Sequence, residues 1–460
     1  MIRSTRLIIA AASLAAASTW AAPCPSGPSY HFLRYNEDFR YLRDPSCRTD
    51  AWDAVKFVAL DDTGERFLTL GGDVRLKLVN SRDVLLGDDL GDNDNVVPQR
   101  YHVHANLRAA SWLRVFAELK FNDVSGREPG PMPADVNRGD THQLFVDVQP
   151  VADATFRVGR QELLYGSGRR IFPANGSNVR GTFDAAKVMF AGTNWAADAL
   201  VFRPVEIDKG AFDDSSIDNQ TFGGIYAVTT PPMLAPFALD LYWIAGRRER
   251  ARFDQGLGTD YRHSFGARFA GIHGPWDVDA EATWQAGHFA AGDIRAWAVT
   301  ADAGYRITAS VPLRAALRLS AASGDRDRNA PDLQTFHWLF PKGPTLDNNF
   351  AIATGNALFA RTALEADLSW SVRMSIDLAW MGRTSLEDTI YRPNGTALRP
   401  SGPSRGRGVG TDVGMTLQWL ADRHTLLFFQ AAAMEPGPFL RDGGLTKRMK
   451  FATLTLAYRF

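Results

Sequence analysis

The segment at residues 276–285 reads WDVDAEATWQ, in which apolar and polar residues alternate without a break. A two-residue period indicates a β-strand with one apolar face and one polar face. The polar face carries Asp277, Asp279 and Glu281, so three carboxylates project from one side of a single strand. Such a ladder of like charges is stable only where water or opposite charges surround it. The fold must therefore provide that environment on one face and shield the other face from water.

The same alternation recurs along most of the chain and predicts eighteen strands. The expected spans are 66–81, 99–111, 112–124, 140–149, 154–163, 180–191, 195–205, 219–229, 236–247, 260–272, 275–289, 294–307, 311–323, 354–370, 371–384, 408–420, 423–434 and 448–460. Two of these segments fit the alternation poorly. In 180–191, Asp184 and Lys187 fall on opposite faces. In 154–163, Arg160 and Glu162 point to the apolar face unless a β-bulge intervenes.

The connections between these strands alternate in length. Those after odd-numbered strands are mostly long, such as 324–353 and 385–407, whereas those after even-numbered strands are mostly short. This pattern and an even strand number are typical of bacterial transmembrane β-barrels, whose turns are short on the periplasmic side. The last segment, FATLTLAYRF, ends in an aromatic residue, as expected of a closing strand recognised by the outer-membrane assembly machinery. We therefore predict an all-β fold, a transmembrane up-and-down antiparallel β-barrel of about 18 strands in the bacterial outer membrane. Either long loop could fold inward as a gate.

The N-terminus predicts export. Basic residues precede an apolar run and then small residues, which is the pattern of a secretory signal peptide. The only two cysteines, Cys24 and Cys47, are expected to form a disulfide in an exported chain. A lipoprotein role for Cys24 is disfavoured because Pro23 precedes it. Past the signal, no segment reaches the roughly 20 apolar residues of a spanning helix. The expected organisation is a signal peptide over 1–22, a periplasmic segment over 23–64 and a barrel over 65–460.

A barrel in lipid explains the acidic ladder, because its apolar face would meet lipid and its acids would face a water-filled lumen. The chain has 51 basic and 51 acidic residues, so strong fields must come from local segregation of charge. This balance also gives no indication of nucleic-acid binding. Cations expected on the lumen faces of other strands are Arg75, Lys77, Arg108, Arg114, Lys120, Arg268, Arg314, Arg318, Arg361 and Arg373. Their number favours a selective, charge-lined conduit over a wide channel whose charges are merely solvated.

Three arginine-rich clusters lie at or near the expected loop bases on the outer side, at 166–172, 245–253 and 401–410. Arginine binds carboxylates through two parallel hydrogen bonds, so these clusters could attract an anionic polymer to the pore. Binding of lipopolysaccharide phosphates at the outer rim explains them equally well. Membrane lipid and lipopolysaccharide are therefore expected partners.

The chain resembles the alginate export family of outer-membrane proteins. The resemblance rests on 34–60 with the strand after it, and on 158–188, which contains a Gly-Arg-Gln-Glu-Leu core and an Arg-x-x-Phe-Asp end. It implies an 18-strand barrel that conducts an anionic uronic-acid polymer through a constriction lined by arginine and lysine. The positions expected to match this lining are Arg75, Lys77, Arg108, Arg160 and Arg180.

The expected function is passive conduction of an anionic, alginate-like polysaccharide. The alternative is an uptake porin for small solutes such as sugars, organic acids or amino acids. An enzyme is not expected, because no Ser-His-acid spacing is recognisable. His102 and His104 would face the lumen together, which indicates lumen lining more often than a metal site, so no metal or cofactor is expected. The residues expected to line the conducting lumen are Arg75, Lys77, Arg108, Arg114, Arg160, Arg180, Arg268, Arg361, Asp277, Asp279 and Glu281.

Overall fold

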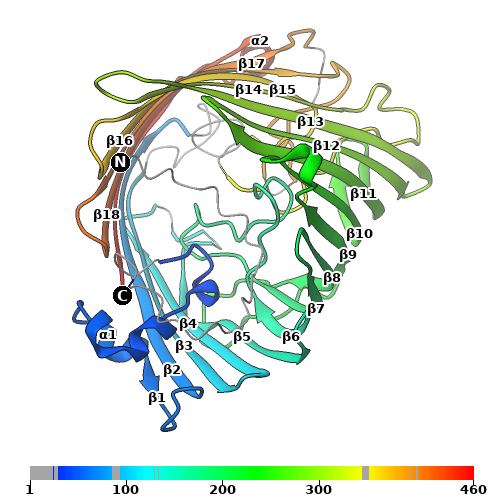
Figure 1. Cartoon of the computed structure of the whole chain (residues 1–460). Helices are drawn as coiled ribbons and strands as arrows, with labels where there is room; N and C mark the ends of the chain where they lie inside the picture. Colours follow the sequence, from blue (N-terminus) through cyan, green and yellow to red (C-terminus); the bar gives the residue numbers. More distant parts are fainter. Residues whose placement is uncertain are drawn as a thin grey trace.

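The computed structural model describes residues 24, 30–84, 94–128, 130–132, 134–343, 352–393, 395–399, 402 and 404–460. Within these residues, strands β2 to β19 follow one another in chain order in one antiparallel sheet. β19 pairs with β2 and closes the sheet into a barrel, which confirms the predicted fold (Figure 1). In the described part of the chain, no helix is long and apolar enough to cross a membrane. The expected signal peptide lies outside the described residues.

The wall of the barrel consists of eighteen described strands. The first nine are β2 (Phe67–Arg82), β3 (Asp94–Ala110), β4 (Leu113–Ser125), β5 (Asn137–Val151), β6 (Ala154–Gln161), β7 (Phe183–Ala191), β8 (Trp195–Pro204), β9 (Gln220–Thr229) and β10 (Ala238–Phe253). The other nine are β11 (Gly256–His273), β12 (Trp276–Phe289), β13 (Gly292–Ile307), β14 (Leu313–Ala322), β15 (Ala357–Asp367), β16 (Val372–Arg383), β17 (Gly408–Leu420), β18 (Thr425–Pro436) and β19 (Met449–Arg459).

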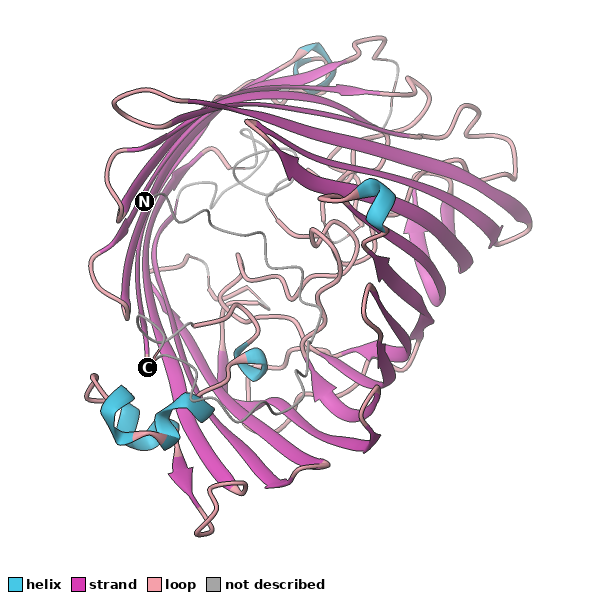
Figure 2. Ribbon diagram, in the orientation of Figure 1, coloured by secondary structure: helices cyan, strands magenta, loops and turns pink. Residues whose placement is uncertain are grey.

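The remaining elements are short. They are the helices α1 (Asp53–Lys56) and α2 (Pro438–Arg441), the two-residue strand β1 (Val58–Ala59), and 3₁₀ turns at Arg34–Asn36, Arg40–Arg43, Pro45–Cys47 and Pro232–Leu234. β1 pairs with the first residues of β2. Figure 2 shows helical turns of the N-terminal segment at the foot of the barrel beside β2, and one such turn inside the ring of strands.

Each predicted strand corresponds to one strand of the wall, and the largest differences lie at the outer rim. β10 and β11 extend further than expected and are joined through Asp254 and Gln255 alone. The arginine-rich cluster at 245–253 therefore lies entirely within β10. The alternation continues through its last residues, because Ala251 and Phe253 are buried and Arg252 is exposed.

The two faces of the wall have opposite chemistry. On β3, the side chain of Val103 is 52% exposed, whereas His102 and His104 are buried. On β12, Trp276 and Trp284 are both exposed, on the face opposite the acidic ladder. This distribution inverts that of a soluble protein, in which ionisable groups are rarely buried and large apolar groups are rarely exposed together. It fits a wall with lipid outside and polar groups within.

Part of the N-terminal segment enters the barrel. The ring of Tyr35 packs edge-on against Phe116 of β4 and Phe145 of β5, with ring centroids 6.0 and 5.3 Å away. Arg34 donates a hydrogen bond to the backbone carbonyl of Gly72 in β2. The segment thus contacts the inner surface of β2, β4 and β5, and is folded partly into the barrel.

The predicted disulfide is confirmed. Cys24 and Cys47 are bonded, with their Cα atoms 5.3 Å apart. Close by in the chain, the ring of Trp52 lies 4.4 Å from that of the C-terminal Phe460. The segment is therefore cross-linked within itself and packs against the end of the closing strand.

Two long loops pack together at the opposite end of the barrel. Phe336 and Trp338, in the loop after β14, share a buried apolar core with Tyr391, in the loop after β16. The loop after β14 also reaches inward, because Phe340 pairs with Ile171 through an isolated bridge. Of the two candidate gating loops, the loop after β14 therefore contacts the lumen. Figure 1 shows loops lying within the ring of strands.

Candidate transport lumen

The acidic ladder of β12 faces the lumen and each of its carboxylates has a cationic partner. Asp277 forms an ion pair with Arg314, with an Nη2–Oδ1 distance of 2.6 Å. Asp279 forms an ion pair with Arg268 of the neighbouring strand, with an Nη2–Oδ2 distance of 2.8 Å. The partners of Glu281 come from a loop. The three carboxylates can share one face of a strand because neighbouring cations compensate their negative charge.

The loop at 162–182 supplies the remaining cations. Nη1 of Arg169 lies 2.7 Å from Asp279 and 3.3 Å from Glu281. Nε of Arg170 lies 3.2 Å from Glu281. Burial lowers the pKa of Arg169, but the neighbouring carboxylates outweigh that effect and hold its pKa above the ordinary value. Arg169 therefore stays charged and clamps the loop to the ladder.

Arg169 and Arg170 lie in the lumen, which corrects the expectation that the cluster at 166–172 lies on the outer side. Leu163 and Ile171 are buried in an apolar cluster with residues of the wall, and Phe340 packs against it. Burial of these apolar side chains draws the loop into the lumen. Arg169 and Arg170 are consequently lumen residues that the sequence did not identify. Alternation describes strands and carries no information about the direction in which a loop folds.

A second set of cations faces the lumen on β2 and β3, nine strands from the ladder. Arg75 donates hydrogen bonds to the backbone carbonyls of Asn175 and Ser177 at 2.7 and 2.8 Å. Arg100 is the register partner of Arg75 and donates to the same two carbonyls at 3.1 and 2.7 Å. Lys77 lies on the same face of β2, two residues along. These three residues, Arg75, Lys77 and Arg100, are referred to below as the basic wall.

The basic wall forms no ion pair with a described carboxylate. Within the described residues, none of its three cations has a carboxylate within 4 Å, and Lys77 forms no hydrogen bond with another described residue. Carbonyl oxygens orient a guanidinium but do not neutralise it. The loop at 162–182 therefore spans the lumen from an uncompensated basic surface to a compensated acidic one. Arg100 was not among the expected lining residues, because the expected strand began only at residue 99.

Two further expected cations hold the N-terminal segment. Arg180 forms an ion pair with Glu162 at 2.5 Å and lies over the ring of Phe32, 4.6 Å from its centroid. Arg114 is buried in β4 and donates a hydrogen bond to the backbone carbonyl of Tyr35. Both side chains face the interior as expected, but their donors are occupied by contacts within the protein.

The other expected cations differ in their surroundings. Arg108 is half-buried, is the register partner of Arg114, and forms no ion pair with any described residue. Nε of Arg361 lies 3.6 Å from Asp377 of the next strand. Its guanidinium also lies over Phe359 on its own strand, 5.3 Å from the ring centroid.

Arg160 lies on the outer face of the wall, not in the lumen as expected. It is the register partner of Leu144, whose side chain is 51% exposed. It forms an ion pair with Asp184 of β7 at 2.9 Å, near the outer ends of the two strands. β6 contains no bulge that would turn the side chain of Arg160 inward. The alternation of the strand therefore places Arg160 correctly on the outer face. Glu162 lies beyond the end of β6, where the chain turns into the lumen.

A cavity of about 690 Å³ opens beside the acidic ladder, along β10 to β16. Its charged lining includes Asp277, Arg268, Arg314, Arg361 and Glu365. The charges of this surface are largely paired, whereas those of the basic wall are not. An anion in the lumen would therefore be attracted to one side of the channel.

The sequence matches the family model described as "Alginate export" over residues 66–452. This range covers every strand of the barrel except part of the last one. No curated protein matches the sequence significantly.

Solved structures with a similar fold include three proteins of Pseudomonas. OpdK of Pseudomonas aeruginosa, solved with vanillate, has a TM-score of 0.60 and 12% identity over 85% of this chain and 98% of its own. OccK2 of the same organism, solved with glucuronate, has a TM-score of 0.56 and 11% identity over 85% and 98%. A BenF-like porin of Pseudomonas fluorescens Pf-5 has a TM-score of 0.57 and 8% identity, again over 85% and 98%. At these identities the likeness concerns the fold alone.

Proposed function

Because the chain belongs to the alginate export family, we propose that this outer-membrane channel conducts an anionic polysaccharide of the alginate type. The basic wall is the observation that supports this substrate class. Its cations face the lumen and have no carboxylate partner among the described residues. The acidic ladder does not oppose an anion, because arginines already compensate it.

In this proposal, the carboxylates of a uronate chain contact Lys77 directly, while the buried guanidiniums of Arg75 and Arg100 attract them through their charge. Lys77 offers a point charge, while Arg75 and Arg100 are held in position by the carbonyls of the loop at 162–182. Conduction requires binding that is strong enough for entry and weak enough for release, which several modest sites achieve. The concentration gradient sets the direction of transport.

Uptake of small carboxylate-bearing solutes is the second candidate. The loop at 162–182 favours it, because its contacts with both walls divide the lumen. Two proteins of similar fold were solved with vanillate and glucuronate, which both carry a carboxylate. The two candidates thus share carboxylate recognition at the basic wall and differ in the length of the solute that passes.

Ion selectivity in planar bilayers tests the role of the basic wall. We expect the wild-type channel to prefer anions in a potassium chloride gradient. Lys77→Glu should lower the chloride-to-potassium permeability ratio several-fold, because it replaces an unpaired lumen cation with an anion. The matched control is Arg203→Glu, which makes the same charge change at a half-exposed position that pairs with Asp218. A cation-selective wild type, or equal shifts in both variants, would contradict the proposal.

Flux of uronates of increasing length separates the two candidates. The polysaccharide proposal expects radiolabelled alginate oligomers to leave channel-containing liposomes at lengths well beyond a few sugars. The small-solute candidate expects glucuronate to pass while longer oligomers only block the ionic current. If neither glucuronate nor oligomers pass or block the channel, both candidates are wrong.

A further inference from the structure

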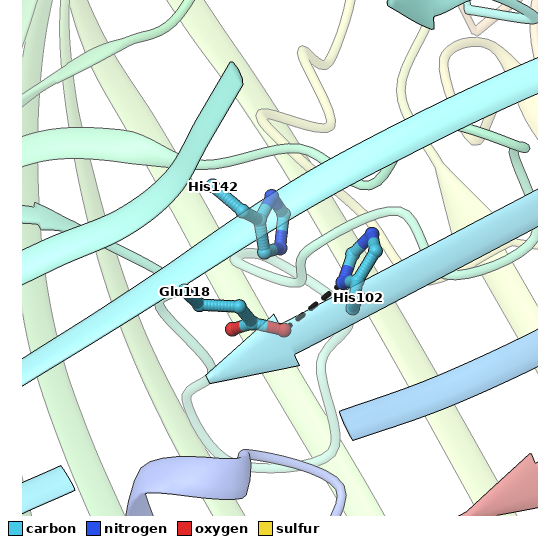
Figure 3. Close-up of side chains that lie close together, drawn as sticks. All are labelled: His102, Glu118 and His142. Carbon is cyan, nitrogen blue, oxygen red and sulfur yellow. Dashed lines mark hydrogen bonds and ion pairs between the residues drawn. The ribbon is translucent and has the colours of Figure 1, made fainter. Parts of the chain in front are cut away.

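Three side chains with metal-binding chemistry meet at the inner surface of β3, β4 and β5, in His102, Glu118 and His142 (Figure 3). Nδ1 of His102 lies 2.9 Å from Oε1 of Glu118. One ligand atom from each of the three lies within 4.8 Å of the other two. The side chains are 1%, 3% and 0% exposed. Two imidazoles and one carboxylate form a donor set that binds zinc in proteins.

A β-bulge brings His142 to this position. Gln143 pairs with Glu118, and Thr141 pairs with the following residue of β4, Leu119, so His142 is an extra residue in β5. His142 and Gln143 are consequently both fully buried, although neighbours in a regular strand face opposite ways. Sequence alternation gave no reason to place His142 beside the histidines of β3.

Each of the two imidazoles has a buried nitrogen without a hydrogen-bond partner. These atoms are Nε2 of His102 and Nδ1 of His142. Nε2 of His142 lies 2.9 Å from Oε1 of Glu162, which also forms an ion pair with Arg180. Metal binding through Nδ1 of His142 requires the tautomer with the proton on Nε2, which then donates to Glu162. Nδ1 then carries a lone pair, and a ring nitrogen of His142 faces the other two side chains in Figure 3.

The neighbouring groups resemble the usual support of a metal centre. A metal-binding histidine typically donates its second ring N–H to a carboxylate, which is the relation of His142 to Glu162. Gln143 donates a hydrogen bond to Oε2 of Glu118 at 2.6 Å, on the oxygen that does not contact His102. Other charged groups near the cluster are Asp73, Arg100, Lys120 and Arg180. Lys120 is itself paired with Asp214, which reduces its repulsion of a cation.

We propose that His102, Glu118 and His142 bind one divalent transition-metal ion, with zinc as the expected ion. Imidazole nitrogen favours zinc over calcium and magnesium, which select oxygen ligands. The ion would replace the hydrogen bond between His102 and Glu118 and take up the lone pair of His142. It would join three strands of the wall and, through Glu162, the base of the loop at 162–182. This role is structural and independent of the solute that the channel conducts.

Zinc titration of the tag-free mature protein in detergent tests the site. After treatment with a chelator, we expect one zinc ion per chain in competition with a chromophoric chelator. His102→Ala and His142→Ala should each weaken binding at least tenfold. Glu162→Gln should weaken it 10- to 100-fold, the usual effect of losing a carboxylate that supports a histidine ligand. The matched control is His288→Ala, which removes an exposed imidazole 3.0 Å from Asp293 and should bind zinc like the wild type.

Equal binding by the wild type and His142→Ala, or loss of binding in His288→Ala, would overturn the proposal. Heat-modifiable migration on gels shows whether each variant forms a barrel. If His142→Ala does not, X-ray absorption of zinc on the wild type decides. Two imidazole nitrogens and a carboxylate oxygen at about 2.0–2.2 Å support the site, whereas no bound zinc or an all-oxygen shell overturns it.

Discussion

At the scale of single residues, the lumen holds two kinds of charge. Arg169 and Arg268 compensate the acidic ladder and hold the structure together. Lys77 and the two arginines of the basic wall have no carboxylate partner among the described residues, and of the three only Lys77 is not buried. A buried ion pair contributes little net stability, but removing one partner leaves an uncompensated charge and is costly. The two kinds should therefore respond differently to mutation.

Arg169→Ala should destabilise the barrel and change its selectivity. The variant leaves Asp279 and Glu281 without one of their cations, so we expect a loss of about 3 kcal/mol in the free energy of unfolding. The loss of one positive charge from the lumen should also shift the reversal potential towards cations. Urea unfolding in detergent and bilayer recordings measure the two effects. Arg373→Ala is the control, because Arg373 pairs with Asp367 at a half-exposed position, and both values should stay close to wild type.

Sequence alternation predicted the positions of some lumen residues and missed the positions of others. Asp277, Asp279 and Arg268 lie in regular strands, so alternation alone assigned their side to the lumen. Arg160 obeys the same alternation, but the family motif suggested a lumen position that the strand does not allow. Arg169 and His142 needed information that alternation lacks, namely the path of a loop and the presence of a bulge.

At the scale of elements, strands were predictable and loops were not. The apolar face of each strand is fixed by contact with lipid, so a shift of one residue would turn every charge outward. This constraint is strong enough to reveal β12 and its neighbours from sequence alone. The loops after β14 and β16 have no such period, and their shared core of Phe336, Trp338 and Tyr391 emerges only in three dimensions.

The packing of these two loops should weaken as the pH rises. Asp325, in the loop after β14, is 3% exposed, and burial raises its pKa to about 6, with a further contribution from Asp388. A raised acid pKa means that the folded loops bind the proton more tightly than the open ones. The resulting stability is present below about pH 4 and is lost as the pH rises through about 6. Its upper limit is roughly 3 kcal/mol, at 1.36 kcal/mol for each of about two pKa units.

Hydrogen exchange of residues 323–343, corrected for intrinsic rates, measures this effect. We expect stronger protection at pH 5 than at pH 7.5. In Asp325→Asn the difference should largely disappear, because an amide does not titrate. Equal protection at both pH values in the wild type, or an undiminished difference in Asp325→Asn, would show that Asp325 does not control the packing.

At the scale of the whole molecule, the barrel is a wall with three internal structures. The N-terminal segment reaches its inner surface through Tyr35, and the loops at 162–182 and after β14 meet within it through Ile171 and Phe340. The wall itself sorts its side chains, with apolar residues towards lipid and charged residues towards the lumen. The proposed conduction along the basic wall depends on this sorting.

Cysteine labelling of the channel in a planar bilayer tests the sorting most directly. Both native cysteines are in a disulfide, so an introduced cysteine is the only free thiol. A negatively charged, membrane-impermeant methanethiosulfonate should modify Lys77→Cys and change the current, because this position faces the lumen. It should not modify Leu78→Cys, because Leu78 is 53% exposed on the outer face. Modification of Leu78→Cys, together with an unreactive Lys77→Cys, would contradict the account.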